Sequence, residues 1–183
     1  INPVSLSATG IYTVTVINAN GCSATATTNV VINALPTPTV NSNSPVCVGK
    51  SLDLTSSGGV SYAWVGPNGF ASSLQNPSIN PVSLSATGVY TVTVTNVNGC
   101  SATATTNVLI NPLPVALISS NSPVCETLPL NISAQSSLGA SYSWNGPKGF
   151  TSSTQNPTIN SPIVANSGIY FLTVTSGDGC TAT

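Results

Sequence analysis

The sequence contains no histidine and no methionine, and it has only two basic and three acidic side chains. The absence of histidine removes the side chain that most often serves as a general base or a metal ligand. The three acids, Asp53, Glu126 and Asp178, lie in distant segments and do not supply a catalytic carboxylate pair or a calcium site. We therefore predict that the chain is not an enzyme and holds no cofactor and no metal.

Clusters of basic residues and long apolar runs are also lacking. The formal net charge is -1, whereas binding to nucleic acid needs clustered Lys and Arg. No run approaches the roughly 18 apolar residues that indicate a membrane span. The mean hydropathy of +0.31 is too high for a disordered segment. We expect neither nucleic acid nor insertion into a membrane.

Alternating apolar and polar residues are abundant. In the stretch from Gly88 to Cys100, Tyr90, Val92 and Val94 alternate with threonines, and an Asn-Gly pair then turns the chain into a second alternating run. This period of two is typical of a strand with one buried face, and the turn predicts a hairpin. The unit recurs at 10–22 and 168–180. The pattern predicts an all-β fold.

The chain contains an internal repeat. Residues 1–36 and 79–114 align with an offset of 78 and differ at five positions, namely 11/89, 17/95, 19/97, 31/109 and 34/112. A repeat of this length suits a small β domain better than a solenoid unit. We predict the C-terminal part of one repeat at 1–34, a complete repeat at 35–112, and a repeat lacking its last strand at 113–183, joined in an elongated array.

The strand pattern of one repeat favours an immunoglobulin-like β-sandwich. It has about seven short strands and a tryptophan on the third, with the segment from Ala71 to Leu84 expected to hold one short strand. Tyr90 occupies the place of the tyrosine corner, and Val92 stands where antibody domains have a core cysteine. A fibronectin-III or PKD-like variant stays an alternative to the immunoglobulin-like sandwich. The predicted core residues are Trp64, Tyr90, Val92, Trp144, Tyr170 and Leu172.

The five cysteines occupy two kinds of position. Cys47 and Cys125 precede the second strand of a repeat, and Cys22, Cys100 and Cys180 follow its turn. A bond within one repeat would join opposite ends of the sandwich, about 20 Å apart at roughly 3.3 Å per residue, whereas a disulfide needs Cα atoms about 4.4–6.8 Å apart. A bond between Cys47 and Cys180 would staple neighbouring repeats. Both pairings, Cys47–Cys100 and Cys47–Cys180, stay open, and either implies an oxidising location.

Two aromatic features suggest contacts. Phe171 takes the outward position that Thr91 holds in the preceding repeat, so we expect it to touch another repeat or a partner. The turn from Trp64 to Phe70 offers aromatic rings to a sugar, although core packing also explains Trp64.

Several short motifs carry a resemblance that covers the whole chain. They are Pro-Val-Cys, Tyr-x-Trp-x-Gly-Pro-x-Gly-Phe, Gln-Asn-Pro, Ser/Thr-Gly-x-Tyr and Asn-Gly-Cys-Ser-Ala-Thr-Ala. The sequence resembles the immunoglobulin-like repeats of large Bacteroidota cell-surface adhesins, including gliding-motility adhesins and cargo of the type IX secretion system. The resemblance implies a secreted, cell-surface stalk or filament whose partners are neighbouring repeats, other copies and surface glycans. The alternative is a carbohydrate-binding or spacer module of a secreted enzyme.

Overall fold

The computed structural model describes residues 2–183, so Ile1, where the first predicted repeat begins, lies outside the described residues. Short strands account for the regular structure, and within residues 2–183 there is no α-helix. The strands are β1 (Gly10–Ile17), β2 (Ser23–Val30), β3 (Thr39–Ser42), β4 (Val46–Cys47), β5 (Leu52–Ser57), β6 (Ser61–Val65), β7 (Ala71–Ser72), β8 (Ser78–Ile79), β9 (Gly88–Thr95), β10 (Ser101–Val108), β11 (Ile110–Asn111), β12 (Ala116–Ser120), β13 (Leu130–Ser136), β14 (Gly139–Gly146), β15 (Phe150–Ser152), β16 (Thr158–Ile159), β17 (Phe171–Ser176) and β18 (Thr181–Ala182). Five single 3-10 turns accompany them, namely η1 (Leu6–Ala8), η2 (Pro67–Gly69), η3 (Leu84–Ala86), η4 (Pro147–Gly149) and η5 (Val164–Asn166).

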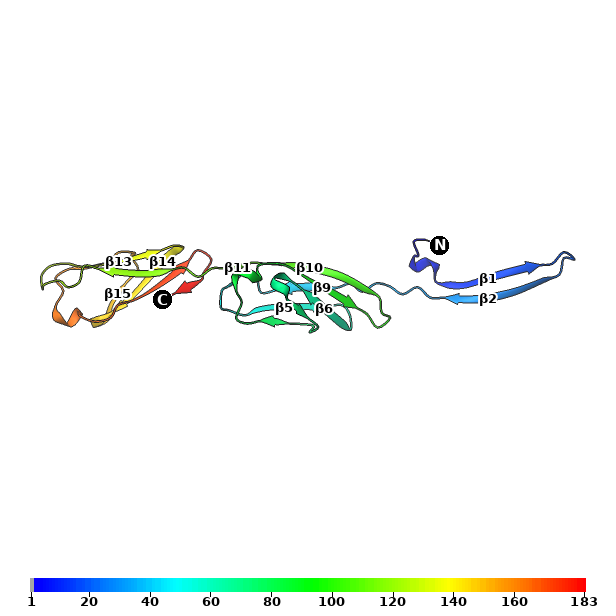
Figure 1. The fold of residues 1–183 in the computed structure, drawn as a ribbon, viewed down its shortest axis with the longest axis horizontal. Helices are drawn as coiled ribbons and strands as arrows, with labels where there is room; N and C mark the ends of the chain where they lie inside the picture. Colours follow the sequence, from blue (N-terminus) through cyan, green and yellow to red (C-terminus); the bar gives the residue numbers. More distant parts are fainter. Residues whose placement is uncertain (1) are drawn as a thin grey trace. The chain divides into compact units, whose positions relative to one another are not determined.

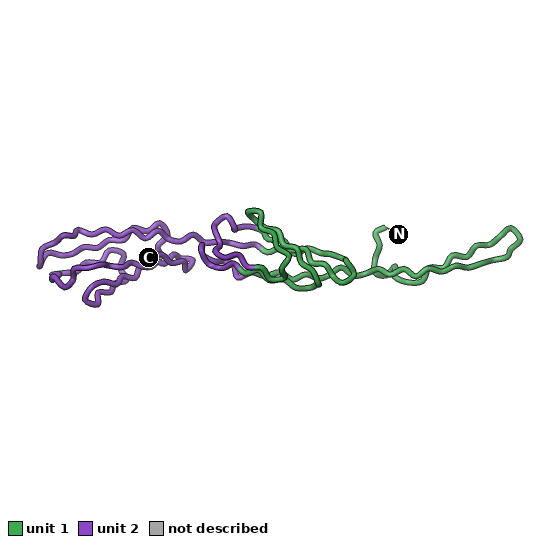
Figure 2. Tube along the Cα trace, turned by 60° about the horizontal axis from the view of Figure 1, so that its bottom comes forward, with its two compact units in different colours: residues 1–42, 53–77, 89–106 green, residues 43–52, 78–88, 107–183 purple. Residues whose placement is uncertain are grey.

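The chain divides into two compact units, which Figure 2 distinguishes by colour. Unit 1 comprises residues 1–42, 53–77 and 89–106, and unit 2 comprises residues 43–52, 78–88 and 107–183. The predicted repeat at 35–112 therefore contributes residues to both units. The boundaries at 34/35 and 112/113 stay a prediction.

In unit 1, β1 and β2 form the first predicted hairpin (Figure 1), with Gly10 opposite Val30 and Ile17 opposite Ser23. Its alternating apolar side chains lie on one face, as the period of two requires. These side chains are exposed: the exposed fraction is 41% for Tyr12, 57% for Val14 and 63% for Val16. The local pattern alone is therefore enough to pair the two strands but not to bury their apolar face.

Nearly the same hairpin sequence is buried on its apolar face in β9 and β10. These strands belong to a sheet with the order β10-β9-β6-β7, in which Trp64 lies opposite Val92. Tyr90, Val92 and Val94 are completely buried. The indole N–H of Trp64 donates a hydrogen bond to the Gln75 carbonyl at 3.3 Å, which satisfies the one polar group that this side chain buries.

Unit 2 contains a two-layer sandwich. One sheet has the order β12-β13-β16 and the other the order β15-β14-β17-β18. Alternate residues of β13, β14 and β17 meet between the layers in a cluster of Leu130, Ile132, Ala134, Trp144, Leu172 and Val174. A first, second and fifth strand facing a third, fourth, sixth and seventh, with a buried Trp on the third, is the arrangement of an immunoglobulin-like sandwich. The predicted all-β, immunoglobulin-like fold is confirmed.

The segment from Ala71 to Leu84 differs from its prediction, because it holds two short strands, β7 and β8, rather than one. β7 pairs with β6 over only two residues. Asn76 and Pro77 then lead away from that sheet: the Asn76 side-chain oxygen accepts a hydrogen bond from the Ser56 N–H at 3.1 Å, and the Pro77 carbonyl accepts one from the Leu54 N–H at 3.0 Å. A change of pairing partner within a few residues leaves no periodic signal to read.

Candidate functional site: the disulfide junction

Cys47 and Cys180 form a disulfide within unit 2. Their Cα atoms lie 5.7 Å apart across a sequence separation of 133 residues, and Cys180 is only 1% exposed. The bond is the second of the two pairings that the sequence left open, and it joins residues of two different predicted repeats. Cys22, Cys100 and Cys125 are free thiols, so the pair within one repeat is not formed.

A short backbone bridge positions Cys47. β4 pairs in parallel with β11, which places Cys47 opposite Asn111. The Val48 N–H donates to the Asn111 carbonyl at 3.0 Å, and the Gly49 N–H donates to the Val82 carbonyl at 2.8 Å. The residues that lead into the next predicted repeat are thus hydrogen-bonded to the strand that carries Cys47.

A tight turn positions Cys180. The Ser176 hydroxyl accepts a hydrogen bond from the Cys180 N–H at 3.2 Å, and the Ser176 N–H donates to the Cys180 carbonyl at 2.8 Å. Gly179 has a φ of 80°, which a residue without a Cβ adopts at no steric cost. The Ser-x-x-Gly-Cys turn therefore fixes the backbone that carries Cys180.

The tyrosine corner closes one end of the sandwich in unit 2. The Tyr170 hydroxyl donates to the Asn166 carbonyl at 2.9 Å, the upstream backbone hydrogen bond that defines this motif. The Tyr170 ring also meets Phe150 edge-on, with ring centroids 5.5 Å apart. Tyr170 is half-buried, less than the full burial expected of a core residue. Burial raises the pKa of the Tyr170 phenol above its ordinary value of 10.0.

This shift predicts a loss of stability in alkali. The unfolded phenol ionises near pH 10 and the folded phenol at higher pH, so the free energy of unfolding keeps its full value below pH 10 and falls as the pH rises beyond it. A Tyr170→Phe variant removes this contribution. We expect its free energy of unfolding, measured by urea titration between pH 9 and 11, to fall less steeply than that of the wild type. Equal slopes for the two proteins would contradict the assignment.

Gly66 approaches Tyr90 too closely to carry a side chain. A Cβ at this position would lie 2.5 Å from Cδ1 of the Tyr90 ring, and the ring is held by an edge-on contact with Phe70 at 5.4 Å between centroids. The φ of Gly66 is -162°, which any residue adopts, so the constraint is steric.

We expect Gly66→Ala to lower the free energy of unfolding by about 1–3 kcal/mol, the usual cost of overpacking. Thermal and urea denaturation measure the effect. Gly177→Ala is the matched control, because a Cβ there meets nothing within 4 Å. Equal losses in both variants would show that the Tyr90 contact is not the cause.

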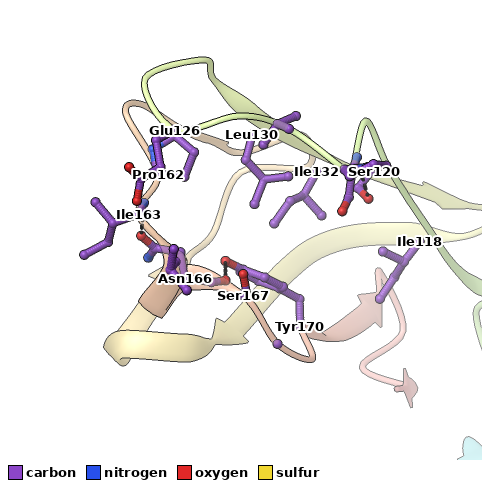
Figure 3. A pocket seen from close by; sticks show the side chains of 15 residues that line it. Ile118, Ser120, Glu126, Leu130, Ile132, Pro162, Ile163, Asn166, Ser167 and Tyr170 are labelled. Carbon is purple, nitrogen blue, oxygen red and sulfur yellow. Dashed lines mark hydrogen bonds between the residues drawn. The ribbon is translucent and has the colours of Figure 1, made fainter.

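A pocket of about 440 Å³ lies beside the tyrosine corner of unit 2. Figure 3 shows Glu126, Leu130 and Ile132 along one side of the pocket and Asn166, Ser167 and Tyr170 along the opposite side. Glu126 is its one acidic lining residue, so the pocket offers no carboxylate pair. Within the described part of the chain, no three His, Cys, Asp or Glu side chains gather as a metal site would require.

The other predicted site residues lie as follows. Trp64 and Trp144 are each 1% exposed, so neither ring is accessible to a sugar. Phe171 is 62% exposed. Tyr90, Val92 and Leu172 are buried. The roles of Asn111, which lies opposite Cys47, and of Ser176, which hydrogen-bonds to Cys180, were not predicted. The available signals were the Asn at the end of the last strand and the Ser four residues before the cysteine.

No protein-family model and no curated protein sequence matches the chain. Among solved structures, murine CEACAM1b is 14% identical with a TM-score of 0.41, and the match covers 77% of this chain and 93% of that one. The three N-terminal domains of the bacteriophage RB49 outer capsid protein Hoc are 16% identical, also at 0.41, over 81% of this chain and 56% of that one. The four N-terminal immunoglobulin domains of Dscam1 isoform 6.9 are 16% identical with a TM-score of 0.34, and the match covers 89% of this chain and 50% of that one. TM-scores of this size give no functional argument. In the described part of the chain, no helix has the length and apolar character to cross a membrane.

Proposed function

We propose that the chain is a load-bearing, non-catalytic stalk segment of a secreted cell-surface adhesin of the Bacteroidota type, built as an elongated array of the repeats at 1–34, 35–112 and 113–183. The observation that carries the proposal is the Cys47–Cys180 disulfide. A bond between residues of successive repeats resists their separation, whereas a bond within one repeat would stabilise only that repeat.

Three observations support a stalk outside the cell. The segments between repeats, Asn33 to Pro36 and Asn111 to Pro114, are short and contain proline, which makes a linker semi-rigid. A disulfide persists in oxidising compartments and is rare in the cytosol. The surface carries few charges and many Ser, Thr and Asn side chains, which limits nonspecific electrostatic binding.

The elongated arrangement is tested by small-angle X-ray scattering. A compact chain of 183 residues would have a radius of gyration of about 16 Å. We expect a value well above this, with the scattering profile of a rod. A radius near that of a compact chain would refute the stalk.

The exposed Phe171 favours a second candidate, a carbohydrate-binding or spacer module of a secreted enzyme. An aromatic ring that is 62% exposed is available to stack on a sugar or on another protein. A glycan-array comparison of the wild type with Phe171→Thr, which installs the residue found at the equivalent Thr91, separates the candidates. Binding that the variant loses favours the module, and no binding by either protein favours the stalk.

A further inference from the structure

The three free thiols occupy the same repeat positions as the bonded pair. Cys100 follows a turn, as Cys180 does, and Cys125 follows Ser-Pro-Val, as Cys47 does. Cys125 and Cys22 are exposed and Cys100 is partly buried. The formed bond between Cys47 and Cys180 shows that these two positions meet in this fold.

The surroundings of Cys100 reproduce one half of the formed junction. Asn33 is the counterpart of Asn111 at the offset of 78, and the Cys100 thiol lies 3.9 Å from the Asn33 carbonyl oxygen. In the formed junction, the equivalent Asn111 lies opposite Cys47. The thiol of Cys100 is therefore next to the backbone on which the partner cysteine of an equivalent junction would be placed.

The turn that carries Cys100 is already bound to this linker. The Asn96 side-chain amide donates to the Ala34 carbonyl at 2.9 Å, and its oxygen accepts a hydrogen bond from the Cys100 N–H at 3.0 Å. The turn of Cys22 has the same internal bond, from the Cys22 N–H to the Asn18 oxygen at 3.0 Å. Among the described residues, however, the hydrogen bonds of that turn stay within residues 18–22.

We propose that Cys100 forms a disulfide with the cysteine of a Ser-Pro-Val-Cys segment in another repeat of this type, and that Cys125 is the reciprocal half of such a bond. The inference rests on the proposed function, because it requires further repeats. The two thiols lose two protons and two electrons to a disulfide oxidant such as glutathione disulfide, which leaves as two thiols.

The segment around Cys125 is accessible for this reaction. Pro123, Val124 and Glu126 line the 440 Å³ pocket, and Figure 3 shows Glu126 on its wall. In the preceding repeat, the Val46 N–H donates to the Leu109 carbonyl at 3.2 Å, so this edge pairs with a strand there. Cys125 itself is exposed, so the turn cysteine of a partner repeat can reach its thiol.

The site is tested on the full chain with a peptide of residues 42–50 whose cysteine is activated as a mixed disulfide with thionitrobenzoate. A protein thiolate attacks the peptide sulfur, and thionitrobenzoate leaves. The matched control is the same peptide N-methylated at Val48, which cannot donate the hydrogen bond that Val48 makes to Asn111 at 3.0 Å. Peptide mapping then gives the rate at each cysteine.

We expect Cys100 to react about threefold to tenfold faster with the intact peptide than with the N-methylated one, the range that one hydrogen bond provides. Cys22 should show a ratio near one although it is more exposed. A ratio near one at Cys100, or a larger ratio at Cys22, would overturn the proposal. Either result would leave the scattering test of the stalk untouched, so the two failures are distinguishable.

A second arm identifies the source of the partner repeat. A Cys22→Ser chain is incubated with glutathione disulfide, and its cross-links are mapped without reduction. Cys100–Cys125 links between molecules assign the partner to a second copy, and mixing Cys100→Ser with Cys125→Ser chains should then give dimers with a single link. Monomers that keep the peptide preference at Cys100 assign the partner to a repeat of the same polypeptide.

Discussion

Stretched from its two ends, the oxidised chain is expected to extend by roughly 450 Å less than a Cys47→Ser/Cys180→Ser variant. The disulfide spans 133 residues of sequence, and an extended chain covers at most about 3.3–3.6 Å per residue. Force that reaches Cys47 passes through the sulfur atoms to Cys180, so the backbone between them carries no tension even after the sandwich unfolds. Single-molecule force spectroscopy measures the extension directly.

Two controls accompany this measurement. Cys100→Ser removes a thiol that is free in the structure, and it should extend like the wild type. A reducing agent should lengthen the wild type to the value of the double variant and leave the double variant unchanged. Equal extensions of the oxidised wild type and the double variant would contradict the Cys47–Cys180 bond.

The second large effect concerns the core. Trp144→Ala is expected to lower the free energy of unfolding by about 3–5 kcal/mol, the usual cost of truncating a buried aromatic residue. Trp144 is 1% exposed and belongs to the cluster between the two sheets of unit 2. Its indole N–H also donates a hydrogen bond to the Thr154 carbonyl at 3.0 Å. The truncation removes this donor and leaves the Thr154 carbonyl without it. Urea denaturation followed by far-UV circular dichroism measures the loss.

Trp144→Phe separates packing from hydrogen bonding, because it keeps a ring but removes the N–H donor. We expect a smaller loss for it than for alanine. Val164→Ala is the surface control, since Val164 is 76% exposed and should change stability by less than about 0.5 kcal/mol. A loss of the same size for Val164→Ala as for Trp144→Ala would mean that the core assignment is wrong.

The strands could be predicted because their signal is local. Tyr90, Val92 and Val94 alternate with threonines, and a period of two fixes both strand and buried face. The burial state could not be predicted in the same way. Tyr12 has nearly the same neighbours in sequence as Tyr90, yet it is 41% exposed and Tyr90 is fully buried. Burial depends on residues distant in sequence, which the local pattern does not contain.

From the sequence alone, the possible partners of Cys47 could be limited to two cysteines, Cys100 and Cys180. The spacing limits which ends of a sandwich can meet, but the position of Cys47 is set by the parallel bridge of β4 to β11, which places it opposite Asn111. That bridge is two residues long in each strand, too short for any periodic signal. The alternation correctly predicted that Phe171 points outward. Alternation does not indicate which group an outward side chain contacts.

The near-identity of the two hairpins has a consequence for how the chain folds. β1–β2 and β9–β10 present almost the same sequence, and both lie in unit 1. Because the two sequences are so similar, we expect that β1–β2 could take the place of β9–β10 beside β6. Exchange of equivalent elements is a characteristic error of repeat proteins. Within the strands β1 and β9, only Ile11/Val89 and Ile17/Thr95 differ, so these two positions are where the sequence can favour one hairpin over the other.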